Sequence, residues 1–234
     1  MLPSRYPEVQ GYPNLQRLLQ AQVDMQFVDL RILLRLPVQQ AGFEAGCNFA
    51  CAAVLFNVIA GASVCFYEAS ENALADHRDR GKRFEEALEK FYPWLGEPFS
   101  KDQCVSTLYK SARNPLAHSL GLDTAPQGST GKQIALMKGP LTRDQIREIE
   151  EASIRPSWML PTIVHLQALA YGSIELAISV PTLSWGVHRM LHALFADSGQ
   201  ATNADALAKA FGPQWNKYTT DEGHLSETST VQKG

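Results

Sequence analysis

The segment YKSARNPLAHSLG, residues 109–121, holds the residue types that phosphodiester chemistry needs. Arg113 can bind a phosphate through two parallel hydrogen bonds, and His118 can take up or release a proton near neutral pH. The two residues are five apart, which on an unbroken α-helix places them about 140° apart on different faces. Pro115 lies between them. Because proline lacks an amide donor and restricts the residue before it, we expect the helix to end or kink at Asn114.

The expected break would bring a helix N-terminus to these side chains. Asn114 would cap the new turn, and Pro115 would be its first residue. Backbone N–H groups at such an end attract anions, and its positive end favours the neutral imidazole of His118. Arg113, Asn114 and His118 are therefore the candidate catalytic residues of a phosphodiester site. The alternative is an ordinary helix-end pair in which Arg113 and His118 satisfy carbonyl groups.

Other cations could guide a nucleic acid toward this segment. Lys110 belongs to the segment itself, and an upstream polar stretch adds four candidate RNA-binding residues, which are Arg78, Arg80, Lys82 and Arg83. Acidic residues at positions 76, 79, 85 and 86 surround that stretch. Such mixed charge is typical of a solvated helix start, which is the alternative to an RNA-binding cluster.

Composition limits what the chain can be. Its 234 residues include 21 Lys and Arg against 24 Asp and Glu, a formal charge of −3, and 45% of the residues are hydrophobic. A chain of this size can bury a sizeable core, but it cannot bind nucleic acid by bulk charge, so phosphate chemistry would depend on a few placed cations. The first residues lack the apolar run of a secretory signal, and four cysteines fit a reduced interior. We therefore expect a cytoplasmic protein.

The first half of the chain predicts helices. Apolar residues spaced three and four apart indicate an amphipathic helix over residues 14–36, which Pro37 ends. An uncharged helix should follow from about residue 43 to 69. Its stretch 47–67 is long enough to cross a bilayer, but its polar and small residues favour a buried core helix. Two more helices, the second begun by a capping box of Ser100 and Gln103, complete an antiparallel bundle.

After residue 122 the pattern becomes mixed. KQIALMK, residues 132–138, is strand-like, and Thr142 with Gln145 should cap a helix that runs to about residue 153. Period-two alternation predicts a β-hairpin over about residues 163–180, followed by a helix to about residue 196 with Pro181 in its first turn.

These elements together predict a mainly α protein in three parts. Residues 14–122 would form the helical bundle. Residues 123–196 would add the β-hairpin and packing helices that complete the same domain, and residues 197–234 would form a short helix and a polar tail.

RNPLAH, residues 113–118, follows an apolar helix and the stretch RFEEALEKFYP, and in this context it resembles the Arg-x4-6-His motif of the HEPN superfamily (higher eukaryotes and prokaryotes nucleotide-binding). The resemblance extends over about residues 15–122. It implies a HEPN-like antiparallel helical bundle that forms a homodimer, with two Arg and His pairs facing one cleft. Many members are metal-independent endoribonucleases of toxin–antitoxin and antiphage defence systems.

The resemblance implies RNA cleavage without a metal or cofactor. His118 would act as the base on the ribose 2′-OH and the partner's histidine as the acid, while Arg113 would stabilise the phosphorane. The need for a 2′-OH would restrict cleavage to RNA. RNA and an antitoxin or defence-system protein would be partners. Toxins silenced by a nucleotidyltransferase tend to carry a Tyr two positions after the motif His, but this chain has Leu120 there, so we do not expect that regulation.

Two alternatives to catalysis remain open. One is a noncatalytic HEPN-like module that binds nucleotides, RNA or protein, and the other is a small membrane protein with residues 47–67 inserted. Two further patterns are weak. His188 and His192 are four apart on one predicted helix but lack a third metal ligand nearby. GSTGKQ, residues 128–133, has Gln133 where a phosphate loop needs Ser or Thr. We therefore expect no metal site.

Overall fold

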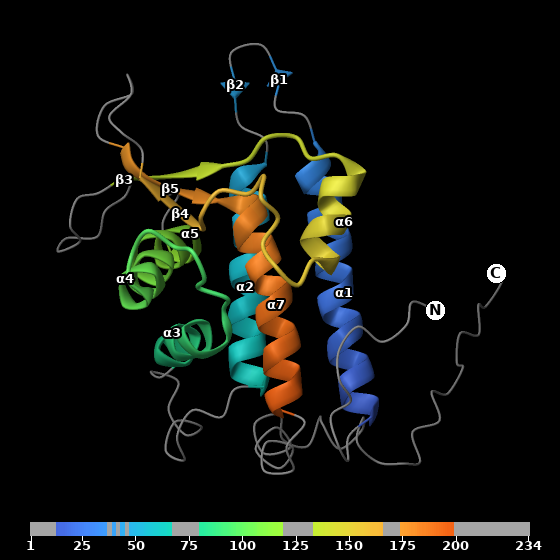
Figure 1. Ribbon diagram of the computed structural model, residues 1–234. Helices are drawn as coiled ribbons and strands as arrows, with labels where there is room; N and C mark the ends of the chain where they lie inside the picture. Colours follow the sequence, from blue (N-terminus) through green and yellow to red (C-terminus); the bar gives the residue numbers. More distant parts are fainter. Residues whose placement is uncertain are drawn as a thin grey trace, which may run out of the picture.

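The computed structural model describes residues 13–36, 39–40, 43–44, 47–66, 80–118, 133–165 and 174–198. Within these ranges the chain is mostly helical with a small three-stranded sheet (Figure 1), which confirms the mainly α prediction. In chain order the elements are α1 (Pro13–Arg35), β1 (Gln39–Gln40), β2 (Phe43–Glu44), α2 (Asn48–Phe66), α3 (Arg80–Phe91), α4 (Lys101–Ser106), a π-helical segment (Thr107–Arg113), α5 (Asn114–His118), β3 (Gln133–Met137), α6 (Arg143–Glu151), β4 (Ile163–His165), β5 (Ile174–Ser179) and α7 (Val180–Ser198).

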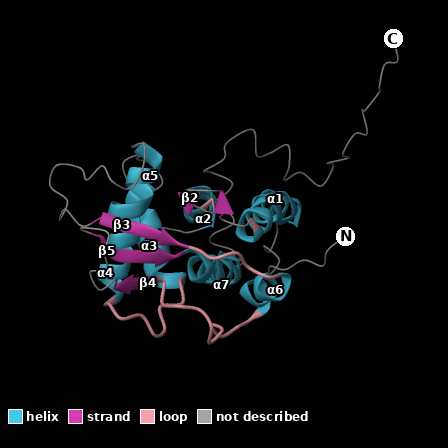
Figure 2. Ribbon diagram, turned by 90° about the horizontal axis from the view of Figure 1, so that it is seen from above, coloured by secondary structure: helices cyan, strands magenta, loops and turns pink. Residues whose placement is uncertain are grey.

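Three long helices, α1, α2 and α7, lie side by side and enclose much of the core (Figure 1). The helices α3, α4 and α5 lie on one side of α2 and α7, while α1 and α6 lie on the other (Figures 1 and 2). Apolar residues of α1 spaced three and four apart face the core, namely Val23, Phe27, Leu30 and Leu34. α7 packs against α2 and α3. A helix from the end of the described chain therefore completes the core that the helices of the first half begin.

The uncharged helix α2 begins at Asn48, and the prediction of a start near residue 43 is wrong. Phe43–Glu44 instead pairs antiparallel with Gln39–Gln40. Cys47 then has a φ of 56°, a left-handed conformation that ends the extended path before the helix. Two residues carry too little pattern to distinguish a short strand from a helix, so the sequence could not show this boundary.

One side of the apolar stretch that α2 occupies is buried within the protein. Cys51, Leu55 and Ile59 are fully buried on it, as a core helix requires. None of the helices in the described ranges is long and apolar enough to span a membrane.

The sheet has the strand order β3, β5, β4 (Figure 2). β4 pairs antiparallel with β5, with Ile163 opposite Ile178, which confirms the predicted hairpin. β3 pairs parallel with β5, with Leu136 opposite Ile178, a pairing between strands far apart in the sequence. α7 follows β5 directly, and Pro181 is in its first turn as predicted. The predicted short helix within residues 203–211 and the polar tail lie outside the described residues.

Both predicted capping boxes are present. The amide of Gln103 donates to Ser100 Oγ at 3.4 Å, and the amide of Ser100 donates to Gln103 Oε1 at 3.1 Å. Thr142 and Gln145 repeat the pattern at 3.2 and 3.0 Å. Each box satisfies two amide groups at the start of its helix and so sets where the helix begins.

A buried carboxylate ties the loop after α3 to the sheet. The Glu97 side chain is 2% exposed, and its Oε1 accepts from Arg155 Nη1 at 3.2 Å and from the amide of Thr162 at 2.9 Å. Its Oε2 accepts from the amide of Ile163 at 3.3 Å. The Glu97 carboxylate thus satisfies the first amide of β4 and the amide just before it.

Tyr92 joins the same region to α7. Its hydroxyl lies 2.9 Å from Thr162 Oγ1 and 3.3 Å from the carbonyl oxygen of Thr182. Burial raises the pKa of Tyr92 above its ordinary value, so the hydroxyl stays protonated. Its ring lies against Gly186 of α7, where an added Cβ would come within 2.1 Å of the ring. The absence of a side chain at Gly186 therefore allows this contact.

Candidate functional site

The candidate site lies on a helix that changes its hydrogen-bonding pattern along its length. α4 runs into the π-helical segment and then into α5 without a gap. The amide of Asn114 donates to the carbonyl of Tyr109, five residues earlier, and Asn114 has helical torsions of φ −65° and ψ −47°. The helix therefore does not end at Asn114, and the prediction that Asn114 caps a new turn is wrong; the chain instead changes there from π-helical to α-helical hydrogen bonding. A π-turn accommodates the proline because its wider path relieves the clash between the ring and the preceding turn.

Tyr109 is held against the first turns of α3. Its ring centroid lies 5.4 Å from that of Phe84. A Cβ added at Gly81 would come within 2.0 Å of the Tyr109 hydroxyl oxygen, so the hydroxyl occupies the space that a side chain at Gly81 would need. α3 thus positions an aromatic ring four residues before the candidate arginine.

Arg113 is half-buried and contacts two neighbours on its own helix. Its Nη1 donates to Asn114 Oδ1 at 2.9 Å, and its guanidinium carbon lies 5.8 Å from the centroid of the Tyr109 ring. The hydrogen bond and the cation–π contact orient the planar guanidinium. The roles of Tyr109 and Gly81 were not foreseen, although the four-residue spacing between Tyr109 and Arg113 is a recognisable helical contact.

His118 is the last residue of α5, and its side chain lies outside the described residues. The backbone from Arg113 to His118 is helical, so ideal geometry separates the two positions by about 140°. The helix N-terminus expected at the site does not form, because α5 continues the π-helical segment. Whether Arg113 and His118 meet at one phosphate remains a prediction.

The candidate RNA-binding residues do not form one exposed cluster among the side chains that are described. Lys110 is exposed. Lys82 is exposed and lies 3.7 Å from Glu86 Oε1 on the same helix, while Arg83 is only 5% exposed. The side chain of Arg80 and all of Arg78 lie outside the described residues. Among the candidate RNA-binding residues whose side chains are described, Lys110 is therefore the exposed one that lies near Arg113 in the sequence.

Two weaker patterns from the sequence, the histidine pair on α7 and the segment GSTGKQ, give no site in the described residues. His188 is 4% exposed, and its ring stacks on that of Phe27 with centroids 3.9 Å apart. No group of three His, Cys, Asp or Glu residues that could hold a metal occurs in the described part of the chain. Most of GSTGKQ lies outside the described residues, and its last residue, Gln133, begins β3.

The cysteines whose side chains are described are free thiols, and two of them are buried. Burial raises the pKa of Cys51 to about 11. Burial, and then the charge of Glu97, raises the pKa of Cys104 to about 12. Both thiols are therefore protonated and unreactive near neutral pH, as residues of a reduced core should be.

Comparison with protein-family models, with curated proteins and with solved structures finds no match to this chain.

Proposed function

We propose that the chain is a metal-independent endoribonuclease in which Arg113 binds the scissile phosphate and His118 acts as base or acid. The observation that carries the proposal is the placement of Arg113. Its guanidinium is oriented by Asn114 and Tyr109 at the end of a π-helical segment, immediately before Pro115. A cation oriented before the substrate arrives stabilises the charge of a phosphorane at little reorganisation cost.

The π-helical segment adds support to the proposal. Short π-helical stretches are rare and occur frequently at functional sites. Here the buried residues Leu108 and Ala112 keep one side of the segment in the core, while Lys110 on the same segment is exposed. The segment can thus present cations without loss of core packing. The homodimer and the antitoxin or defence partner implied by the HEPN resemblance belong to the same proposal.

A second candidate is a noncatalytic RNA-binding module of the same fold. The helical torsions of Asn114 favour it, because an unbroken helix separates Arg113 from His118 within one chain. In such a module Arg113 contacts a phosphate, and His118 has no part in bond cleavage.

The test is incubation of purified protein with end-labelled RNA and with DNA of the same sequence in EDTA. The native chain should cleave the RNA and leave the DNA intact, and Arg113→Ala and His118→Ala should each remove the activity. Arg143→Ala is the matched control because Arg143 is an exposed arginine on α6. Equal cleavage by the native chain and both site variants would contradict the proposal.

Binding of a labelled RNA by the same proteins, followed by fluorescence anisotropy, separates the two candidates. Binding that depends on Arg113, without cleavage and without an effect of His118→Ala, would favour the noncatalytic module. Toxicity on expression that both site variants relieve would support the nuclease.

A further inference from the structure

The outer side of α1 carries an exposed apolar stripe. Its large side chains are spaced three and four positions apart, namely Met25, Val28, Ile32 and Leu36, which are 55%, 47%, 57% and 40% exposed. In Figure 2, α1 and α2 lie on the side of the protein away from α6 and α7, and no described helix covers them there. Single exposed hydrophobic residues are normal on a protein surface, but a continuous stripe of them indicates a contact surface.

The neighbouring helix α2 carries a stripe of smaller residues on the same side of the protein. The helix contains no Asp, Glu, Lys or Arg along its whole length. The stripe consists of Ala50, Asn57 and Gly61, which are exposed, and Ala53, which is half-buried. The solvent-facing side of a helix normally carries charged side chains, so the composition of this stripe is that of a surface that becomes covered.

The packing of the described residues does not account for Gly61. Glycine in the interior of a helix is destabilising relative to alanine. At Gly81 and Gly186 a tyrosine side chain occupies the space that a Cβ would need, but a Cβ built on Gly61 meets nothing within 4 Å. The space above the Gly61 backbone is therefore open to a side chain from another molecule.

The two stripes have the same spacing. Positions 25, 28, 32 and 36 follow one another at intervals of three, four and four, as do positions 50, 53, 57 and 61. α1 and α2 run antiparallel, because β1 and β2, which follow α1 and precede α2, lie together at the upper ends of both helices (Figure 1). A two-fold rotation about an axis through this face reverses α1 and sets it on α2 of a second copy, with both helices running in the same direction. At one register each large side chain of one copy then lies over a smaller residue of the other, with Met25 over Ala50, Val28 over Ala53, Ile32 over Asn57 and Leu36 over Gly61.

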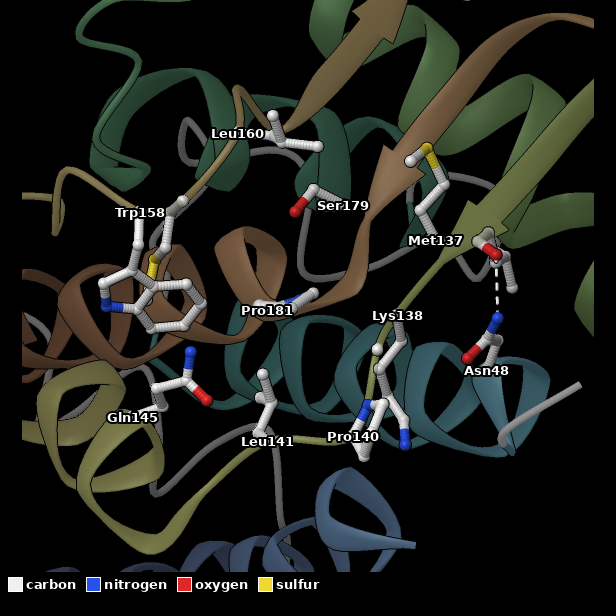
Figure 3. Close-up of a pocket in the computed structure, with 13 residues that line it drawn as sticks. Asn48, Met137, Lys138, Pro140, Leu141, Gln145, Trp158, Leu160, Ser179 and Pro181 are labelled. Atoms are coloured by element: carbon white, nitrogen blue, oxygen red, sulfur yellow. Dashed lines mark hydrogen bonds between the residues drawn. The ribbon is translucent and has the colours of Figure 1, made fainter. Parts of the chain in front are cut away.

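Both helices are fixed to β3 at their upper ends. Asn48, at the start of α2, donates from Nδ2 to the carbonyl oxygen of Leu136 at 2.8 Å (Figure 3). Lys138, directly after β3, donates from Nζ to the carbonyl oxygens of Leu33 and Leu34 at 2.8 and 3.3 Å. The two stripes therefore keep a fixed relation to each other, and a surface that is ordered in advance loses less entropy on binding.

From these observations we infer that the face formed by the two stripes is the interface between two copies of this chain. The exposed charged residues on the described part of α1 are Asp29 and Arg35, one of each sign, so the face carries no net charge that would repel an identical face. The HEPN resemblance implies a dimer in which the two candidate sites face one cleft. The face inferred here contains neither Arg113 nor His118, so it does not depend on RNA cleavage.

The test is sedimentation velocity of the full chain at about 1 to 100 µM, the range of weak to moderate association. The native chain should form dimers. Ile32→Asp and Gly61→Leu should each raise the dissociation constant at least about tenfold, because each change occurs twice in the dimer. Both positions are exposed, and thermal unfolding shows that the variants are folded. Leu95→Asp is the matched control, since Leu95 is an exposed apolar residue outside the face. A native chain that stays monomeric, or a dimer that both changes leave intact, would overturn the inference.

A pair of opposite charges tests which residues face each other. Ile32→Glu and Asn57→Lys should each weaken the dimer when the variants are measured separately. When the two variants are mixed, the introduced charges face each other at one contact and the other contact is native, so dimers should return with a dissociation constant at least about tenfold lower. A mixture that stays monomeric would overturn the pairing of α1 with α2. Arg113→Ala should form dimers as the native chain does, so loss of the dimer and loss of RNA cleavage are measured separately.

Discussion

Glu97 and Arg113 are both charged side chains with defined partners, but their surroundings differ. Glu97 is almost fully buried, and its partners Arg155, Thr162 and Ile163 come from a distant part of the sequence. Arg113 is half-buried, and its contacts with Asn114 and Tyr109 lie one and four residues away. Long-range buried contacts hold elements together, whereas local contacts mainly orient the side chain that makes them. Glu97 should therefore matter to folding, and the orientation of Arg113 suits the proposed role in RNA cleavage.

The largest effect on folding is expected for Glu97→Ala. The substitution leaves the Arg155 charge unpaired and two amides near β4 without their acceptor, so the free energy of unfolding should fall by about 3–5 kcal/mol. Urea unfolding measures the change. Glu89→Ala is the control, because Glu89 lies 3.6 Å from Lys101 in an exposed pair that should contribute less than about 1 kcal/mol. Equal losses for the two variants would remove the distinction between buried and exposed carboxylates.

A smaller loss is expected for Tyr92→Phe. The ring and its contact with Gly186 remain, but Thr162 and Thr182 lose a buried hydroxyl partner. We expect a decrease of about 1–3 kcal/mol in the free energy of unfolding, measured in urea, with RNA cleavage unchanged in the folded protein. A loss of cleavage without a loss of stability would mean that this region and the Arg113 site are not separate.

Pro115→Ala should have a still smaller effect on stability. Alanine supplies the missing amide donor and favours helix, which should stabilise the fold, but it also removes a buried ring, which should destabilise it. The free energy of unfolding should therefore change by less than about 1 kcal/mol. Without the proline the reason for the π-turn is lost, and a shift toward α-helix would turn Arg113 away from its position. Amide hydrogen exchange over residues 107–114 and RNA cleavage should both change. If both stay as in the native chain, the proline does not cause the π-turn.

The features that the sequence predicted correctly depend on neighbouring residues. The capping boxes at Ser100 and Thr142, the apolar stripe of α1 and the β4–β5 hairpin all follow from local spacing. The parallel pairing of β3 with β5 and the ion pair between Glu97 and Arg155 join distant segments, and nothing in the sequence near Glu97 shows that it is buried.

The candidate site was predicted in part. The candidate residues Arg113 and His118 were chosen from their types and spacing. The predicted end of the helix before Pro115 was wrong, because a proline can follow a π-turn as well as a break in a helix. The contact between Tyr109 and Arg113 follows the four-residue helical spacing and could have been found from sequence. The contact between Tyr109 and Gly81 depends on how α3 packs and could not.

The central claim is the proposal that Arg113 serves RNA cleavage, and Arg113→Lys tests it most directly. Lysine keeps the charge but lacks the planar fork that binds a phosphate through two hydrogen bonds. In urea unfolding the variant should lose no more than about 1 kcal/mol, because lysine keeps the charge and an aliphatic stem at this half-buried position. In EDTA it should lose at least about 90% of RNA cleavage, which corresponds to about 1.4 kcal/mol or more of transition-state stabilisation. Native cleavage by this variant, or a loss of cleavage explained by a matching loss of stability, would contradict the claim.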